Sequence, residues 1–276
     1  ELKVGDITLE PLASADAVLG EDEKDAGVVL VDIGGGTTDI AIFKDGIIRH
    51  TAVIPFGGKV ITEDIKEGCE IIEKQAELLK VKFGSAWPGE NKDNEIVSIP
   101  GLRGRAPKEI SLKTLSKIIN ARVKEIIESV VSEISNYQQN DPRKKLIAGI
   151  VVTGGGSQLK HMGQLVEYLT GMQTRIGYPN EHLASGYQKE LASPVYATSI
   201  GLLSMALAET TEPMAYDPNE IVLPESEATT EAVPEEVLEE GAPEQEGSTK
   251  AKPRKDPIWK GFVSGIKQWL EDDDIE

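Results

Sequence analysis

The sequence predicts an α/β fold in which helices cover a mixed β-sheet. Residues 28–54 and 147–152 are rich in β-branched and aliphatic side chains, and in each region three consecutive glycines follow a strand pattern. Between them, apolar residues recur at spacings of three and four, which is the pattern of amphipathic helices. Strands that alternate with helices in this way favour an α/β architecture.

The first strands are expected to form an antiparallel meander. Residues 28–32 form an apolar run that ends in an acid and three glycines, and the strand pattern resumes over 39–43. A second turn, Lys44-Asp45-Gly46, precedes a third strand over 47–53. Tight turns between consecutive strands predict this arrangement.

Helical patterns flank the meander. After a strand-like segment at 7–9, residues 14–19 look helical, and residues 61–79 place apolar side chains on one helical face. A longer helix, of roughly 25 residues, is expected over 112–137. Because Cys69 lies on the apolar face, it is interpreted as a small core residue rather than a redox or catalytic one.

The remaining elements alternate between strand and helix. Residues 59–111 are predicted to form a helical subdomain, partly irregular and rich in Pro and Gly, with a short strand at 96–99. The strand at 147–152 runs into a glycine turn and a helix over about 158–169. A last helix covers about 196–208, so we expect an α/β domain over residues 1–208.

The acidic charge is concentrated in one segment. The net charge is -18, and residues 209–248 contain 13 acidic residues and no Lys or Arg. With five prolines and few large apolar side chains, this stretch cannot bury enough surface to offset its ordering entropy. Residues 209–256 are therefore predicted to be a disordered linker; an acidic docking tail for a cationic partner is the alternative.

Composition also excludes some classes of protein. A single cysteine gives neither a disulfide framework nor a thiolate metal site, and it fits a reducing cytosol. The sequence has no apolar run of about 18 residues and no signal peptide, so we expect that it does not span a membrane. The chain opens at Glu1 with what reads as the middle of a domain, so we also expect a fragment of a longer protein.

The turn after the first strand has the chemistry of a phosphate-binding loop. Consecutive glycines allow positive φ and let backbone N–H groups approach an anion without a Cβ in the way. The threonine hydroxyls can add donors, and the acid could hold Mg²⁺ through its water shell or orient an attacking water. A tight hairpin turn is the plainer alternative. The candidate residues are Asp32 (catalytic or metal) and Gly34, Gly35, Gly36, Thr37 and Thr38 (phosphates).

A second glycine turn lies about 120 residues later, where a strand meets a helix. Helix N-termini attract anions, so Gly154, Gly155, Gly156 and Ser157 are further candidate binding residues. One such turn is weak evidence, but two in one α/β chain predict a nucleotide site. Neither turn has the spacing of a Walker or dinucleotide-binding motif, because no Gly-Lys-Ser/Thr follows.

These motifs carry a resemblance to a known superfamily. Residues 32–43 resemble the second phosphate motif of the actin, chaperone ATPase and sugar kinase superfamily, and residues 150–162 resemble its adenosine motif. The resemblance implies an actin-like, ribonuclease H-like fold, of which this chain would form the second half. It also implies that Glu77 and Lys80 contact ribose and adenine, although an exposed helical charge pair is the alternative. Residues 193–205 resemble the second connecting helix, where small residues permit close packing.

The resemblance can be narrowed to one family. Leu9 to Ala15, Ile54 to Gly58 and Ala76 to Ser85, together with the two glycine turns, are similar to bacterial cell-division proteins of the FtsA family. The similarity runs in order through the first 208 residues. In that family the first phosphate motif and an additional subdomain are expected in an N-terminal half that this sequence lacks.

Residues 257–271 are expected to form an amphipathic helix that lies in the membrane interface. On a helical wheel the apolar residues occupy an arc of about 140°. Asp256 and Pro257 suit the N-cap and the first turn, and four basic residues lie just upstream. Such a pattern is typical of interfacial helices, although docking on a protein groove is an alternative. The membrane-facing residues are Ile258, Trp259, Phe262, Val263, Ile266, Trp269 and Leu270.

The resemblance implies an ATP-binding membrane adaptor for bacterial cytokinesis, with ATP and Mg²⁺ as cofactors. Its expected partners are the tubulin-like FtsZ ring, other copies of itself in an actin-like protofilament, the anionic membrane surface and later division proteins; no nucleic acid is expected. It would act at the division site, on the cytoplasmic face of the inner membrane. ATP is expected to be mainly a conformational ligand, with weak or no hydrolysis.

Two alternatives stay open at this point. Another actin-like scaffold, of the pilus-assembly PilM group or the MreB shape-filament group, is the runner-up, and the terminal helix after an acidic linker argues against both. A sugar kinase or chaperone ATPase is the third class. The sequence shows no catalytic His-Asp pair for such an enzyme, because His50, His161 and His182 are scattered.

Overall fold

The computed structural model describes residues 4, 6–91, 94–101, 106–139, 141–180 and 189–210. All of them belong to the first of the two compact units of the chain, Glu1–Tyr216. The predicted linker, apart from its first two residues, and the predicted amphipathic helix lie outside the described residues. Among the helices that are described, none combines the length and the apolar character of a membrane span.

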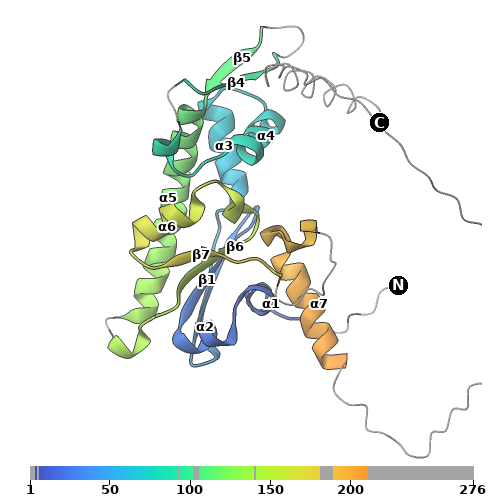
Figure 1. Ribbon diagram of the computed structural model, residues 1–276, viewed down its shortest axis with the longest axis vertical. Helices are drawn as coiled ribbons and strands as arrows, with labels where there is room; N and C mark the ends of the chain where they lie inside the picture. Colours follow the sequence, from blue (N-terminus) through green and yellow to red (C-terminus); the bar gives the residue numbers. More distant parts are fainter. Residues whose placement is uncertain are drawn as a thin grey trace, which may run out of the picture. The chain divides into compact units, whose positions relative to one another are not determined.

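A five-stranded mixed sheet forms the centre of the domain (Figure 1). Its strand order is β3-β2-β1-β6-β7, where β1 pairs antiparallel with β2 and parallel with β6. The predicted meander and the α/β class with a mixed sheet are therefore confirmed. The strands are β1 (Val28–Ile33), β2 (Thr38–Lys44), β3 (Ile47–Ile54), β6 (Gly149–Thr153) and β7 (Thr174–Ile176).

Helices cover both faces of this sheet, which explains the unbroken apolar run of its central strand. On β1, Val29, Val31 and Ile33 face the larger core, which also contains residues of α5 and α6. Val28 and Leu30 point the other way, into a smaller core with α1 and α7. These helices are α1 (Glu10–Val18), α5 (Leu112–Gln138), α6 (Met162–Thr170) and α7 (Ala197–Thr210).

The N-terminal expectation was partly wrong. Residues 7–9 form no strand, and the helix predicted over 14–19 begins earlier, at Glu10. Pro11 explains this start, because proline in the first helical turn has a suitable φ and needs no N–H partner. The helix also places Ser14, which is fully buried, within hydrogen-bonding distance of Asp32 on β1.

The single helix expected over 61–79 was also wrong. The structure has two helices, α3 (Gly58–Gly68) and α4 (Glu73–Phe83), separated by a break in which Glu70 has φ 47°. Both helices bury their apolar residues in the same core, so the spacing of three and four continues across the break. Cys69 follows the end of α3 and is 5% exposed, which confirms its interpretation as a core residue.

We call the region around these two helices, residues 58–111, the helical subdomain. It also contains a two-stranded antiparallel sheet, β4 (Ile96–Ile99) with β5 (Lys108–Ser111), of which the sequence predicted β4. Helix α5 then runs from this subdomain to the far end of the central sheet (Figure 1). Arg122 on α5 donates from Nε and Nη2 to Asp64 on α3, over 2.6 and 3.0 Å, and so ties the two together.

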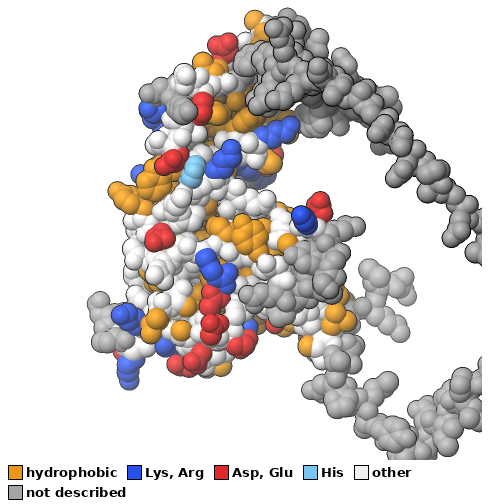
Figure 2. Space-filling view, in the orientation of Figure 1, with side chains coloured by type: hydrophobic (Ala, Val, Ile, Leu, Met, Phe, Trp, Pro, Cys, Tyr) orange, Lys and Arg blue, Asp and Glu red, His pale blue; other side chains and the backbone are white. Residues whose placement is uncertain are grey.

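The remaining elements are short. Helix α2 (Glu21–Ala26) carries four acids, and Figure 2 shows acidic side chains gathered over it. Arg175 on β7 donates to Glu23 and thereby fixes α2 against the sheet edge. Short 3₁₀ turns occupy Pro88–Glu90, Pro142–Lys144, Gly155–Gln158, Lys189–Ala192 and Pro194–Tyr196.

Candidate nucleotide-binding site

The first glycine turn, between β1 and β2, is fixed by the N-terminus of α3. Gly58 N–H donates to Gly34 O over 2.9 Å, and Lys59 N–H donates to Gly35 O over 2.8 Å. A Cβ at Gly57 would lie 2.6 Å from Gly34 O, so this contact requires glycine. The sequence Gly57-Gly58 thus lets the helical subdomain dock its first turn directly on the candidate phosphate loop.

The two threonine hydroxyls predicted to bind phosphates both donate hydrogen bonds within the protein. Thr38 is fully buried and donates to Phe56 O over 2.8 Å, while Thr37 donates to Asp39 Oδ2 over 2.9 Å. Gly36 and Thr37 are exposed at the tip of the turn. None of the three glycines of this turn has positive φ, so the conformational reason given for them from sequence was wrong.

The second glycine turn needs glycine for a different reason. Gly154 has φ 79°, and a Cβ there would lie 2.2 Å from Asp32 Oδ1. A Cβ at Gly156 would lie 2.3 Å from Cγ2 of Ile33. Ser157 Oγ donates to Gly154 O over 2.7 Å and closes the turn. Because β1 and β6 are parallel neighbours, the two glycine turns emerge at the same edge of the sheet.

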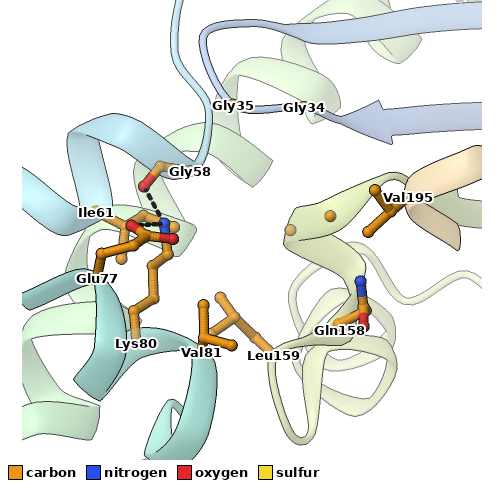
Figure 3. A pocket seen from close by; sticks show the side chains of 12 residues that line it. Gly34, Gly35, Gly58, Ile61, Glu77, Lys80, Val81, Gln158, Leu159 and Val195 are labelled. Carbon is orange, nitrogen blue, oxygen red and sulfur yellow. Dashed lines mark hydrogen bonds and ion pairs between the residues drawn. The ribbon is translucent and has the colours of Figure 1, made fainter. Parts of the chain in front are cut away.

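A cavity of about 380 Å³ opens between the two turns and the helical subdomain (Figure 3). Its volume is within the range typical of small-molecule sites. The predicted residues that line it are Gly34, Gly35, Glu77, Lys80, Gly155 and Gly156. The lining residues that the sequence did not predict are Gly58, Ile61, Val81, Gln158, Leu159 and Val195. The predicted residues Asp32, Gly36, Thr37, Thr38, Gly154 and Ser157 lie beside the cavity without lining it.

One wall of the cavity is a polar network on α3 and α4. Lys80 Nζ donates to Gly58 O and Thr62 Oγ1, each over 2.8 Å, and lies 2.7 Å from Glu77 Oε2. Thr62 Oγ1 donates to Glu77 Oε2 over 2.5 Å. The Lys80 side chain is 13% exposed and the Glu77 side chain is 48% exposed, so Lys80 is the more buried partner of a pair that lines the cavity. Figure 3 shows Glu77 and Lys80 directed toward Gly58.

Another part of the cavity lining is apolar. Val81 and Leu159 lie close to each other in Figure 3, and Val195 flanks the second glycine turn. Val81 is 71% exposed, whereas Leu159 is 9% exposed. Apolar side chains beside a few directed polar groups are typical of sites that bind small molecules or cofactors.

Asp32 is the last residue but one of β1, just before the first glycine turn, and is 6% exposed. Burial raises the pKa of this carboxyl from 3.8 to about 6, against the opposing effect of the hydrogen bond that Ser14 Oγ donates over 2.7 Å. The neighbouring carboxylates Glu10 and Asp39 raise its pKa further. A carboxyl that is desolvated and close to other acids is well suited to respond to a cation.

The chemistry of the donors fits Mg²⁺ only in combination with a ligand. Within the described residues, no group of three or more His, Cys, Asp or Glu side chains is arranged to hold a metal. Mg²⁺ is usually bound through one or two carboxylates, substrate phosphates and water, and Asp32 fits this mode. Asp32 would then supply the protein's share of the ion's outer shell.

The two described histidines, His50 and His161, do not line the cavity. His50 Nε2 lies 3.0 Å from Glu133 Oε2, and His161 Nδ1 lies 3.0 Å from Ser85 Oγ. His182 is outside the described residues. Each described histidine therefore has a polar side-chain partner outside the cavity.

Sequence reasoning missed residues whose roles depend on tertiary contacts. Thr62 and Ser14 reach the site because α3 and α1 are docked against it, and nothing in their local spacing indicates a polar role. Val81 lies between Lys80 and Lys82 and could have been noticed as an apolar residue between two charged ones. Gly58 belongs to the Ile54 to Gly58 segment, which carried the resemblance but had no assigned contact.

Comparison with known proteins now decides the family. A family model described as "Cell division protein FtsA" matches residues 29–201. The chain belongs to the FtsA family. The matched residues include both glycine turns and the polar wall formed by Glu77 and Lys80.

Curated relatives support the same assignment. FtsA of Neisseria meningitidis serogroup B is 41% identical over 205 residues, which cover 74% of this chain and 49% of the relative. FtsA of Pseudomonas aeruginosa is 40% identical over 216 residues (78% and 50%), and FtsA of Escherichia coli K12 is 38% identical over 206 residues (73% and 49%). The chain thus spans about half the length of these relatives.

Solved structures confirm the actin-like fold. MreB5 of Spiroplasma citri bound to ADP aligns with a TM-score of 0.58 at 22% identity, covering 74% of this chain and 60% of that one. The PilM–PilN type IV pilus biogenesis complex aligns with a TM-score of 0.56 at 17% identity (74% and 53%), and the MamK double helical filament with 0.54 at 18% (72% and 58%). At these identities the likeness shows the fold alone, and the FtsA assignment rests on the sequence comparisons.

Proposed function

We propose that this FtsA-family chain binds ATP with Mg²⁺ in the cavity between its two glycine turns and acts as a membrane adaptor in cell division. One observation carries the nucleotide part of the proposal. The β1–β6 pairing brings both turns to one edge of the sheet, where they face the Lys80–Glu77 wall across a cavity of about 380 Å³.

Each side of the cavity has chemistry suited to one part of the nucleotide. Backbone N–H groups near Gly34 and Gly35 would receive the phosphates. Gly155 and Gly156 would allow the nucleoside to approach the backbone, with Val81 and Leu159 beside the base. Glu77 and Lys80 would bind the ribose hydroxyls, since together they supply an acceptor and a donor.

ATP would act mainly as a conformational ligand. Mg²⁺, when bound, would neutralise phosphate charge. The polar network reaches from the first glycine turn through Gly58 to Lys80 and so links the phosphate end to the helical subdomain. A ligand that competes for Lys80 would loosen its bond to Gly58 O. We infer weak or no hydrolysis by this chain.

Amide NMR with Mg-ATP tests the nucleotide site on the 276-residue chain, because this method also detects weak binding. We expect the amides of Gly34, Gly35, Gly155 and Gly156 to shift on titration. Lys80→Ala should weaken binding by about tenfold, the typical value of a charged hydrogen bond, whereas Lys82→Ala on the same helix should not. Shifts that avoid both turns, or equal effects of the two variants, would contradict the proposed site.

The adaptor part of the proposal rests on the family and on the sequence of the C-terminal region. Residues 257–271 would attach the protein to an anionic membrane at the cytoplasmic face of the inner membrane, at the division site. FtsZ, later division proteins and further copies of the chain in an actin-like protofilament are its proposed partners. A single helix of this length would bind weakly, so an array of copies would be needed for stable attachment.

Co-sedimentation with vesicles that contain anionic lipid tests the membrane attachment. The unmodified chain should pellet with vesicles, and the variant Trp259→Glu/Trp269→Glu should stay in the supernatant. The matched control Ser264→Glu/Gln268→Glu adds the same charge on the polar face and should retain most of the binding. If both double variants bind equally, or if the unmodified chain does not pellet, the helix is not a membrane anchor and docking on a protein groove becomes the better reading.

A further inference from the structure

Three elements meet at Asp32 through hydroxyl groups that the nucleotide site itself does not use. Ser14 Oγ on α1 donates to Asp32 Oδ2 over 2.7 Å, and Ser14 Oγ lies 2.9 Å from Thr198 Oγ1 on α7. A serine hydroxyl has one hydrogen, and here it is given to the carboxylate. Thr198 must therefore be the donor to Ser14. The result is a directed hydrogen-bond chain from α7 through α1 to β1.

The geometry of this chain is fixed by close backbone packing next to it. A Cβ at Gly201 would lie 1.7 Å from Ala13 O, so α1 and α7 are in direct backbone contact at that point. Gly201 is one helical turn after Thr198, and Ala13 precedes Ser14. Ala13 and Ser14 are both fully buried. The two hydroxyls are therefore held in register by a contact that leaves the helices little freedom to slide.

Burial and close neighbours restrict the orientation of the Asp32 carboxylate, which is 6% exposed. Its Oδ1 faces the backbone of Gly154, where an added Cβ would lie 2.2 Å from that oxygen. Its Oδ2 accepts the hydrogen bond from Ser14 Oγ. A change at Ser14 therefore removes a contact that holds one of the two carboxylate oxygens in place.

We propose that Ser14 and Thr198 are positioning residues that orient the Asp32 carboxylate toward a Mg²⁺-bound triphosphate and so couple the α1–α7 helix pair to the occupancy of the site. The inference rests on the proposed nucleotide function. Because coupling is reciprocal, a ligand that engages Asp32 must stabilise this register of α1 and α7 to the same extent that the register favours the ligand.

The test compares ATP affinity in Mg²⁺ and in EDTA for the 276-residue chain and for Ser14→Ala, Thr198→Val and Thr198→Ser. We expect Ser14→Ala to reduce the Mg²⁺-dependent gain in affinity by about tenfold, because a hydrogen bond to a charged group is lost. Thr198→Val should reduce the gain by a few-fold, since it acts through Ser14, and Thr198→Ser should restore it. Affinity in EDTA should stay the same in all variants.

A merely structural role predicts a different pattern. If Ser14→Ala lowers affinity equally in Mg²⁺ and EDTA, or leaves the Mg²⁺-dependent gain within twofold, the positioning role is refuted while the nucleotide site stands. If the unmodified chain binds ATP in neither buffer, both proposals fail. Thr198 is partly buried, so Thr198→Val and Thr198→Ser decide the question even if Ser14→Ala does not fold.

Discussion

The buried carboxyl of Asp32 makes a specific prediction about stability: Asp32→Asn should make the protein more stable at neutral pH. The pKa of Asp32 in the folded protein is raised from 3.8 to about 6, chiefly by burial. The folded state therefore holds a proton between about pH 4 and pH 6 that the unfolded state has released, and stability is lost as pH rises through 6. A shift of about two units corresponds to roughly 3 kcal/mol above pH 6.

An amide at position 32 avoids this penalty because it carries no charge. At pH 8 we expect the free energy of unfolding to rise by up to about 3 kcal/mol, or roughly 6–12 °C in Tm for a domain of this size. Below about pH 4, where Asp32 is protonated in both states, the difference should vanish. Thermal unfolding followed by circular dichroism from pH 4 to pH 8 measures it.

The control is Asp25→Asn, which removes the same charge from an exposed position on α2. It should change Tm little at any pH, because surface substitutions rarely alter stability by more than about 0.5 kcal/mol. Two results would contradict the prediction: a loss of stability of Asp32→Asn at pH 8, or an effect on stability that does not depend on pH. Either result would mean that burial does not raise the pKa of Asp32 at a cost in folding free energy. Asp32→Asn should also lose the Mg²⁺-dependent part of ATP affinity, so the residue would be retained for function at the expense of stability.

Two further predictions concern packing. Gly201→Ala should destabilise the protein by several kcal/mol, because the added Cβ would lie 1.7 Å from Ala13 O, although alanine is the better helix former. The control is Gly163→Ala on α6, where the nearest atom to the added Cβ lies at 3.8 Å, and it should be neutral or slightly stabilising. Urea unfolding compares the two, and equal effects would contradict the close α1–α7 contact. Burial raises the pKa of the Cys69 thiol, so its reaction with a thiol reagent at pH 8 should be much slower in the native protein than in guanidinium; equal rates would contradict its place in the core.

Sequence reasoning succeeded where a physical pattern was local. The apolar run of β1, the turns of the meander and the stripe of α5 all depend on neighbours within a few residues, and all were confirmed. It failed at the Cys69 to Ile72 break, because both helices share one core and the apolar spacing runs through the break. It also could not anticipate that Thr38 donates to Phe56 O, since that contact depends on how α3 docks on the first turn.

Contacts between distant residues were also missed in three other places: the strand β5, Thr62 and Ser14. β5 is a four-residue strand whose only described partner is β4, so its formation depends on pairing more than on its own sequence. Ser14 and Thr62 acquire roles through partners that lie 18 and 15 residues away. Local spacing carries no information about such contacts. The glycine turns, in contrast, could be recognised from sequence because three consecutive glycines after a strand are an unusual pattern.

The two glycine turns differ in what requires their glycines, and this difference gives a test of function that packing cannot imitate. Around a Cβ at Gly35 or Gly36 no atom lies within 4 Å, and neither residue has positive φ, so the fold itself tolerates a side chain there. At Gly154 a Cβ would meet Asp32 Oδ1 at 2.2 Å, and φ is 79°.

Gly35→Ala should therefore leave the unfolding temperature within about 2 °C of the parent, yet lower ATP affinity by tenfold or more, because the added methyl group would hold a phosphate away from the backbone N–H groups. Gly154→Ala should unfold the protein or lower its stability by several kcal/mol, since the clash is with the core. Calorimetry and the Mg-ATP titration on the same samples separate the two effects. If Gly35→Ala binds ATP like the parent, the first turn is an ordinary hairpin and its three glycines do not mark a phosphate site.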